Sequence, residues 1–552
     1  MASSSTIHVL PSQFQIWDHP GCKLVAKMEL KAESLRKQFP VLIDLRFFSS
    51  FGPRFANSTN PKLNSVARSA TRLPRRFVMP RSSLFALTIA TLFCTTTAAH
   101  AGRFIAASTQ GIQNHYIVLL ADSPQGMLKA EDLASMSPMQ EITQAILSDH
   151  AVAGPLRIYQ HAIRGFAVEM TEKQARRLAR DPRVARVEQD RLIQVQAPLC
   201  PDVSFPPASV MPTSPQSVPC LITASSCNEN WGLDRIDQVH LPLDSSFHFS
   251  HVGTGVNIYF IDTGLDYFHT EFKNASGASR VGLSINFASN VNGNPGAVDP
   301  NNYYDGYGHG THMAAVAAGL RYGVAKNATI HSVRVTDNNA LSSTSLVLSG
   351  VDWIVSHHVK PAVVNISMNF KVDRESVNDP SNLNLMEQAF HNLVTSYGVT
   401  VVNSAGNFNQ DAVNISPSRL PELIVVGATF NDDSRWAVAP QGQPCYLPRF
   451  SDPYSQCGSD FGPYVDLFAP GYGIVSAWTN SSTRTGACQE YPGTSMAAAL
   501  TSGVAALYLE THPLALPSEV QQALINHAAS GVLYPNDLGA GTPNRMLQTF
   551  YP

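Results

Sequence analysis

Three short segments contain the side chains that nucleophilic catalysis by serine requires. Asp262 lies in Asp-Thr-Gly, His309 in Gly-His-Gly-Thr-His, and Ser495 in Gly-Thr-Ser-Met-Ala. A serine hydroxyl is a weak nucleophile at neutral pH, so a base such as histidine must take its proton during attack. A buried carboxylate holds the imidazole in one tautomer and stabilises the imidazolium that forms. We therefore predict that Asp262 orients the imidazole, that His309 is the base and that Ser495 is the nucleophile.

The residues around these segments predict the elements that must position them. Residues 256–261 form an apolar, β-branched and aromatic run that ends at the aspartate and is typical of a buried parallel strand. His309 precedes the small-residue run 313–319, and Ser495 opens the run 496–509, which is rich in alanine and leucine. Both runs predict helices. Because catalytic groups gather at the carboxyl ends of parallel strands, we expect the three side chains to meet at that edge.

A fourth segment supplies a hydrogen-bond donor. Residues 399–402 predict a further strand, and the small polar turn Asn-Ser-Ala-Gly-Asn follows it and ends at Asn407. We expect the Asn407 amide to donate to an oxyanion together with the Ser495 backbone N–H. Loss of one such donor typically lowers turnover by ~10²- to 10³-fold. Taken alone, Asn407 would equally fit a residue that tolerates a turn conformation, so this prediction depends on the other three motifs.

With these motifs the chain resembles the subtilisin-like serine proteases, closest to their proteinase K-like branch. The chain order Asp, His, Ser is that of subtilisin. Residues 231–233, 365–369 and 541–544 add to a resemblance that covers residues 114–552. The resemblance implies an endopeptidase that cleaves proteins or peptides through an acyl-enzyme. It also implies that substrate binds as an added strand, next to an apolar first pocket, at Ser367, Met368, Asn369, Ala405 and Gly406.

Three departures from the family pattern concern specificity and packing rather than the catalytic groups. Asn369 stands where the family usually has glycine, so its side chain is expected to narrow or redirect the substrate groove. The usual Thr-Pro-His after Ser-Met-Ala is replaced by Ala498-Ala499-Leu500. The usual glycine after His-Met-Ala is Ala315.

Strands and helices alternate from residue 231 onward, which predicts an α/β fold with a subtilisin-like parallel sheet and helices on both faces. The predicted strands cover residues 256–261, 330–335, 362–366, 399–402 and 423–428, and the predicted helices cover residues 345–357, 384–396, 495–509 and 518–527. Residues 114–193 predict a small α+β unit, with strands at 115–120 and 184–193, a hairpin at 158–170, and helices at 136–151 and after Thr171. The resemblance implies a ferredoxin-like propeptide whose tail occupies the active site. The alternative is a permanent accessory domain.

The chain is expected to have five parts: an N-terminal extension or mis-assigned start (1–78), a signal peptide (79–101), a propeptide (102–197), a Pro/Ser-rich linker (198–226) and a subtilase catalytic domain (227–552). The signal is predicted from an arginine, the apolar run 84–94 and an Ala-His-Ala cleavage motif. Such a run is too short for a stable membrane span. We therefore expect a secreted, extracellular protein.

The junction between propeptide and catalytic domain is less sharply predicted. By resemblance, cleavage is expected near Gln196-Ala197, and the propeptide acts as an intramolecular inhibitor. A cut directly before Pro198 would require a bond whose nitrogen lies in a ring, so the linker 198–226 offers alternative positions.

Cysteine content and charge limit the remaining possibilities. An even number of cysteines in an exported chain predicts disulfides, with fifteen possible pairings among Cys200, Cys220, Cys227, Cys445, Cys457 and Cys488. The cysteines lack metal-ligand spacing, so we expect no metal and no cofactor in the chemistry. Structural calcium is common in the family, but no loop has a decisive pattern of oxygen ligands. The net charge of −3 gives no reason to expect a nucleic-acid partner, and we expect a monomer.

The sequence leaves two questions open. The first is a catalytically silent secreted binding protein on the same scaffold. Since no catalytic group is missing, an endopeptidase made as a zymogen is favoured. The second concerns His312, one helical turn after His309, which is expected to pack or hydrogen-bond rather than to act as a second base.

Overall fold

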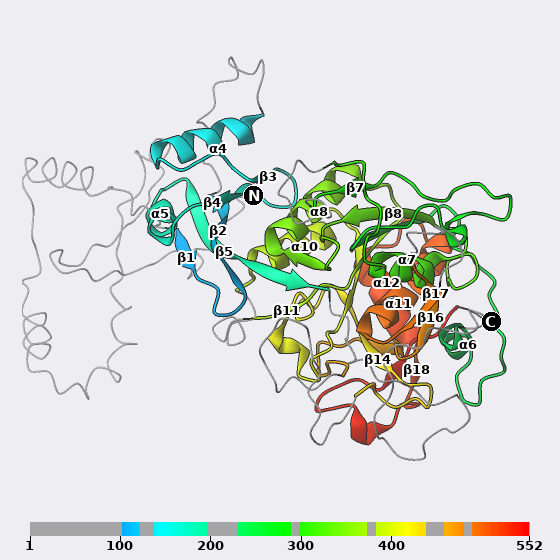
Figure 1. Cartoon of the computed structure of the whole chain (residues 1–552). Helices are drawn as coiled ribbons and strands as arrows, with labels where there is room; N and C mark the ends of the chain where they lie inside the picture. The colour runs from blue at the N-terminus through cyan, green and yellow to red at the C-terminus, as the bar shows by residue number, and fades with distance from the viewer. Residues whose placement is uncertain are drawn as a thin grey trace, which may run out of the picture. The chain divides into compact units, whose positions relative to one another are not determined.

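The computed structural model describes residues 102–121, 137–195, 230–288, 299–372, 382–437, 458–479 and 488–550 (Figure 1). The predicted extension, signal peptide and linker lie outside these ranges, as do five of the six cysteines that we expect in disulfides. Cys488 is described and is disulfide-bonded. Within the described ranges, none of the helices combines the length and the apolar character needed to cross a bilayer.

A nine-stranded sheet forms the centre of the catalytic domain, in the order β18-β19-β15-β14-β12-β10-β6-β8-β7. Every neighbouring pair is parallel except β18 with β19. The strands are β6 (Asn257–Asp262), β7 (Ile285–Asn286), β8 (Thr329–Arg334), β10 (Ala362–Ile366), β12 (Thr400–Ser404), β14 (Ile424–Thr429), β15 (Leu467–Pro470), β18 (Ala529–Ser530) and β19 (Arg545–Met546). The five predicted strands and the predicted parallel sheet are confirmed, whereas β7, β15, β18 and β19 were not predicted.

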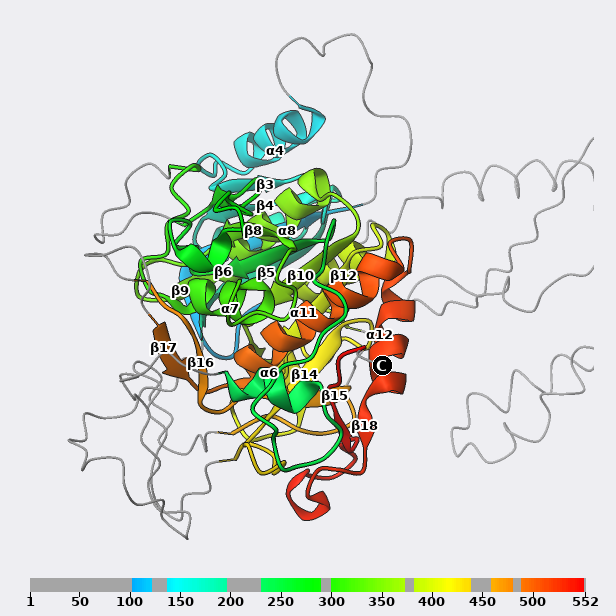
Figure 2. The ribbon, with the colours of Figure 1, turned by 90° about the vertical axis from the view of Figure 1, so that its right-hand side faces the viewer.

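Helices cover both faces of this sheet, as predicted. On one face α7 (His309–Ala318) packs against α11 (Thr494–Thr511), which also contacts α12 (Pro517–His527) (Figure 2). On the other face α8 (Thr344–His357) packs against α10 (Leu385–Thr395). The residues of β6 alternate between the two cores: Ile258 and Phe260 pack with α7 and α11, and Tyr259 and Ile261 pack with α8 and α10. Burial on both faces explains why residues 258–261 of this strand form an uninterrupted run of apolar and aromatic side chains.

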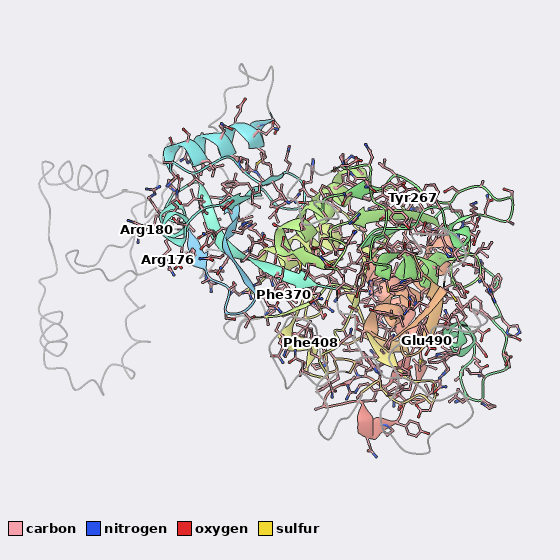
Figure 3. All side chains as sticks on the ribbon, viewed as in Figure 1. Arg176, Arg180, Tyr267, Phe370, Phe408 and Glu490 are labelled. Atoms are coloured by element: carbon pink, nitrogen blue, oxygen red, sulfur yellow. The ribbon has the colours of Figure 1, made fainter. Side chains whose placement is uncertain are left out.

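The α+β unit that precedes the catalytic domain also matches its prediction. Its elements are β1 (Arg103–Ile105), β2 (Gly111–Leu120), α4 (Pro138–Asp149), β3 (Arg157–Tyr159), β4 (Gly165–Glu169), α5 (Glu172–Leu178) and β5 (Val184–Gln194), with sheet order β1-β5-β2-β4-β3. The predicted capping box of α5 is present, since Thr171 and Gln174 cap each other's backbone N–H. Strand β1 was not predicted. It pairs with β5. The guanidinium of Arg176, a residue of α5 that Figure 3 labels, lies 4.1 Å from the centre of the Phe104 ring of β1.

The remaining described elements are short. They are α6 (Trp231–Ile236), β9 (Leu341–Ser343), the pair β11 (Phe370–Lys371) and β13 (Ile415–Ser416), the pair β16 (Ile474–Ala477) and β17 (Cys488–Tyr491), and the 3₁₀ turns η4 (Thr270–Phe272), η5 (Ala412–Asn414) and η6 (Pro535–Asp537). Of these, β9 matters for the site because β5 pairs with it.

Candidate active site

Asp262, the last residue of β6, and His309, the first residue of α7, form a hydrogen-bonded pair. His309 Nδ1 lies 2.8 Å from Asp262 Oδ1 and 3.0 Å from Asp262 Oδ2, and both side chains are buried. Donation from Nδ1 leaves a lone pair on Nε2, which is the tautomer that a base requires. Among the described residues, His309 Nε2 has no hydrogen-bond partner.

Two residues that precede His309, Gly308 and Asp305, fix the start of α7. Gly308 has φ +122°, and a Cβ at this position would lie 2.3 Å from the Trp478 ring, so only glycine fits. The Asp305 carboxylate accepts hydrogen bonds from Gly308 N at 2.7 Å, Thr311 N at 2.9 Å and Thr311 Oγ1 at 2.7 Å. Asp305 therefore satisfies N–H groups of the first turn that would otherwise be unpaired. The sequence analysis missed Asp305, although an acidic residue shortly before a helix start is a recognisable cap signal.

Ser495 is the second residue of α11 and is buried. Because α7 and α11 pack together, the structure brings the helix that carries the base against the helix that carries the hydroxyl (Figure 2). No hydrogen bond joins Ser495 Oγ to His309 Nε2 in the described structure. Such bonds are often long in the absence of substrate and shorten in the Michaelis complex.

Asn407 is anchored to the residue that precedes Ser495. Its Oδ1 accepts hydrogen bonds from Thr494 N at 2.9 Å and from Thr494 Oγ1 at 2.7 Å. With Oδ1 held there, the amide orientation is set and Nδ2 is the end that donates. A Cβ built on Gly493 would lie 3.3 Å from Nδ2. The Asn407 NH₂ group therefore lies at the start of α11, where the Ser495 backbone N–H also lies.

A buried carboxylate that the sequence analysis did not find supports the Asn407 loop. Asp460 N donates to Gly406 O at 2.8 Å, and Asp460 Oδ1 accepts from Phe408 N at 3.0 Å and from Gln410 N at 2.8 Å. Burial raises the pKa of the Asp460 carboxyl well above its usual value. A Cβ on Gly406, whose φ is +115°, would lie 2.2 Å from Asp460 Oδ2. Asp460 thus holds the backbone on both sides of Asn407.

The five residues expected to bind substrate follow two neighbouring strands. Ser367, Met368 and Asn369 come directly after β10, and Ala405 and Gly406 come directly after β12. These two strands are paired, so the structure brings the two segments together. All five residues are buried. The Asn369 side chain turns toward β12.

His312 is a structural histidine, as the sequence predicted. Its Nε2 lies 3.1 Å from both Ile474 O and Gln489 O, so this nitrogen carries the proton and donates to two carbonyl groups. Burial, with a smaller effect of neighbouring His309, lowers the pKa of His312 to about 3. His312 is therefore neutral and links α7 to the β16–β17 pair.

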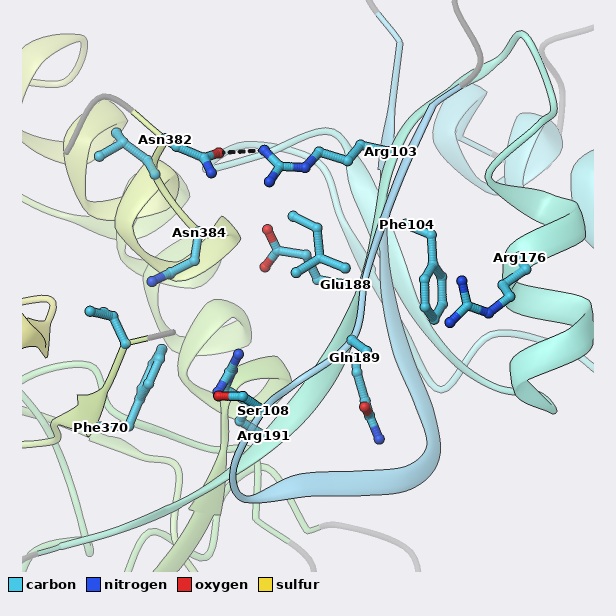
Figure 4. A pocket seen from close by; sticks show the side chains of 14 residues that line it. Arg103, Phe104, Ser108, Arg176, Glu188, Gln189, Arg191, Phe370, Asn382 and Asn384 are labelled. Carbon is cyan, nitrogen blue, oxygen red and sulfur yellow. Dashed lines mark hydrogen bonds between the residues drawn. The ribbon is translucent and has the colours of Figure 1, made fainter. Parts of the chain in front are cut away.

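The described residues contain no group of three or more His, Cys, Asp or Glu side chains placed to hold a metal ion. A cavity of about 440 Å³ lies between the α+β unit and the catalytic domain (Figure 4). Its lining includes Arg103, Glu188 and Phe370, and Arg103 donates to Asn382 Oδ1 at 3.0 Å. None of the predicted catalytic residues lines it, so this cavity is separate from the candidate active site.

The last strand of the α+β unit is bound to the catalytic domain. β5 pairs antiparallel with β9, and Val195 N continues the pairing by donating to Ala340 O at 3.0 Å. The carboxylate of Glu188 accepts from Leu385 N, at the start of α10, at 3.0 Å. In the opposite direction, Asp352 of α8 accepts from three consecutive backbone N–H groups of the unit, those of Gln160, His161 and Ala162. The position where we expect cleavage follows Val195 directly.

Two family models and several known proteases match the chain. The model described as Subtilase family matches residues 253–547, and the model described as Peptidase inhibitor I9 matches residues 115–196. The chain is 37% identical to the Extracellular serine proteinase of Thermus sp. (strain Rt41A), over 71% of this chain and 77% of that protein. It is 33% identical to Alkaline serine exoprotease A of Vibrio alginolyticus, over 76% of this chain and 65% of that protein. A solved cold adapted subtilisin-like serine proteinase matches with 34% identity and a TM-score of 0.47, over 58% of this chain and 98% of that one.

The fold and the comparisons define a serine endopeptidase with an inhibitor-type propeptide. The chain belongs to the subtilase family. Membership confirms the predicted fold class and the predicted enzyme class, and the relatives lend no support to the alternative of a catalytically silent binding protein.

Proposed function

We propose that this chain is the zymogen of a secreted endopeptidase that works through an acyl-enzyme on Ser495. His309 Nε2 takes the hydroxyl proton as Ser495 Oγ bonds to the peptide carbonyl carbon. The same proton then passes to the amine nitrogen as the carbon–nitrogen bond breaks. A water molecule next gives a proton to Nε2 and attacks the ester, and Ser495 Oγ regains a proton as the acid product leaves.

One observation carries this proposal. His309 Nδ1 contacts both oxygens of Asp262, and the opposite ring nitrogen is buried with no hydrogen-bond partner among the residues that the structure describes. Leaving a buried ring nitrogen without a hydrogen bond costs free energy. An imidazole that is held at Nδ1 and has a free lone pair on Nε2 is therefore suited to accept a proton. The anchored Asn407 supports the proposal further. Because Oδ1 accepts from Thr494, Nδ2 is the donor that we assign to the oxyanion, together with the Ser495 N–H.

Inhibition by the propeptide and secretion belong to the same proposal. The pairing of β5 with β9 and the contacts of Glu188 and Asp352 support a docked inhibitor whose tail continues toward the site. The extracellular serine proteinase among the relatives supports export. Sequencing of the amino terminus of the secreted enzyme tests both points. A mature start before Leu192 would argue against self-cleavage at the predicted junction.

Labelling with a fluorophosphonate probe tests the chemistry. The processed wild-type enzyme is expected to be labelled on one residue, and Ser495→Ala is expected to abolish labelling. Ser356→Ala, which removes an exposed hydroxyl of α8, is the matched control and should label like the wild type. His309→Ala should still fold, but the probe should label it far more slowly than the wild type. Labelling that persists in Ser495→Ala would overturn the assignment of the nucleophile.

A further inference from the structure

Asn369 joins the ends of two neighbouring strands through its side chain. Its Nδ2 donates to the backbone oxygen of Ser404 at 3.0 Å and to Ser404 Oγ at 2.9 Å. The residue is buried, with 5% of its surface exposed. One amide therefore spans the distance between the segment after β10 and the end of β12.

Other buried side chains hold the same Ser404 carbonyl. Asn403 Nδ2 donates to it at 2.9 Å, and Ser418 Oγ donates to it at 3.0 Å. Asn403 Nδ2 also donates to Ser418 Oγ at 2.9 Å. Asn369, Asn403, Ser404 and Ser418 thus form one buried polar cluster without a charged member. Buried clusters of this kind are rigid, because moving one member leaves its partners without hydrogen bonds.

This cluster lies where a substrate side chain must go. In the proposed mechanism, the carbonyl oxygen of the attacked residue faces Asn407 and the Ser495 N–H. The Cα of that residue is bonded to the same carbonyl carbon, so its side chain starts next to the Asn407 loop. The loop begins at the end of β12, immediately after Ser404, and the segment after β10 lies beside it. The side chain of the attacked residue must therefore enter between these two segments.

We infer that Asn369 closes the inner end of this space, so that the enzyme cleaves after residues with small uncharged side chains. The inference rests on the proposed function and specifies its substrate class. A large apolar side chain has to displace Asn369 from Ser404, and the displaced amide and carbonyl then lose their partners inside the protein. A charged side chain finds no opposite charge in the cluster and cannot be buried there cheaply.

Two peptide substrates that differ only in the residue before the cleaved bond, alanine against phenylalanine, test the inference. For the processed wild-type enzyme, kcat/KM is expected to be at least about 10-fold higher for the alanine substrate. Asn369→Gly removes the amide and should raise the phenylalanine to alanine ratio of kcat/KM by about 10- to 100-fold. Asn369→Ala also removes the amide without adding backbone freedom, so it should shift the ratio in the same direction.

The matched control is Asn327→Gly, which makes the same substitution at an exposed asparagine. It should leave the ratio unchanged. Wild-type enzyme that prefers phenylalanine, or an unchanged ratio in both Asn369 variants, would overturn the inference. Active sites are titrated with the fluorophosphonate probe in each preparation. Absence of labelling in the wild type would instead refute the proposed function, so the two failures are distinguishable.

Discussion

Asp190 of the propeptide accepts two hydrogen bonds from Ser345 in the first turn of α8, from the backbone N at 3.0 Å and from Oγ at 2.6 Å. Both residues are buried. A carboxylate at this position accepts a hydrogen bond from a backbone N–H that has no partner within the helix, and it interacts favourably with the helix dipole. The α+β unit therefore caps a helix of the catalytic domain.

Replacing Asp190 should weaken the hold of the propeptide. In Asp190→Ala the Ser345 hydroxyl and N–H lose their acceptor in a buried interface, at a cost of about 1–3 kcal/mol. After self-cleavage, the variant is expected to release its propeptide sooner and to reach full activity with a shorter lag. The lag is measured by following peptide hydrolysis after processing. Glu172→Gln, at an exposed carboxylate of the same unit, is the control and should keep the wild-type lag.

The hold of the propeptide should also depend on pH. Burial raises the pKa of both the Glu188 and the Asp190 carboxyl in the docked unit. Because protonation is easier in the docked state than in the free propeptide, docking takes up protons. Its affinity is greatest below the free carboxyl pKa of about 4 and falls as pH rises through the raised values. We expect a shorter lag after incubation at pH 8 than at pH 5, with activity assayed at one common pH. A lag that does not vary with pH would contradict a role of these two carboxyls. The same holds if the lag varies with pH equally in a Glu188→Gln, Asp190→Asn double variant.

The candidate catalytic motifs stand out in the sequence because each is local. Asp262 ends an apolar strand, and His309 and Ser495 open helices next to glycine, so residue type and immediate neighbours carry the signal. Asp460 carries no such signal, because its importance comes from backbone groups about fifty residues away in the chain. The same holds for the pairing of Asn369 with Ser404, which depends on two strands lying side by side.

The elements that the sequence analysis missed are short or depend on distant partners. Strand β15 has four residues and ends in proline, so it offers too little alternation or length to stand out. Strands β1 and β9 have three residues each and exist because β5 pairs with both. The ends of long apolar strands and of capped helices were predicted within a few residues, because their periodicity and their capping residues depend on neighbouring positions in the sequence.

His312 should make the protein less stable in acid. Because its pKa in the folded chain is lowered to about 3, the unfolded chain binds more protons between that value and the ordinary histidine pKa of about 6.5. The contribution of His312 to stability is therefore greatest above pH 6.5 and falls as pH drops, by roughly 2 to 3 kcal/mol between pH 6.5 and pH 4. Urea unfolding of the inactive Ser495→Ala chain measures this loss. In His312→Asn the loss should shrink, whereas His240→Asn, at an exposed histidine, should reproduce the original slope. Equal slopes in all three proteins would refute the assignment to His312.

Asp460 should affect turnover through the Asn407 loop. Asp460→Ala removes the acceptor of Phe408 N and Gln410 N, so the loop can shift and the Asn407 amide loses its fixed position. We expect kcat to fall by about 10- to 100-fold with little change in KM, which is less than the ~10²- to 10³-fold loss typical of removing an oxyanion donor itself. Asp460→Asn keeps an acceptor oxygen at the same place and should recover kcat to within a few-fold of wild type. A purely structural role would lower the unfolding midpoint of Asp460→Ala while leaving the kcat of the folded fraction intact, and active-site titration separates these two results.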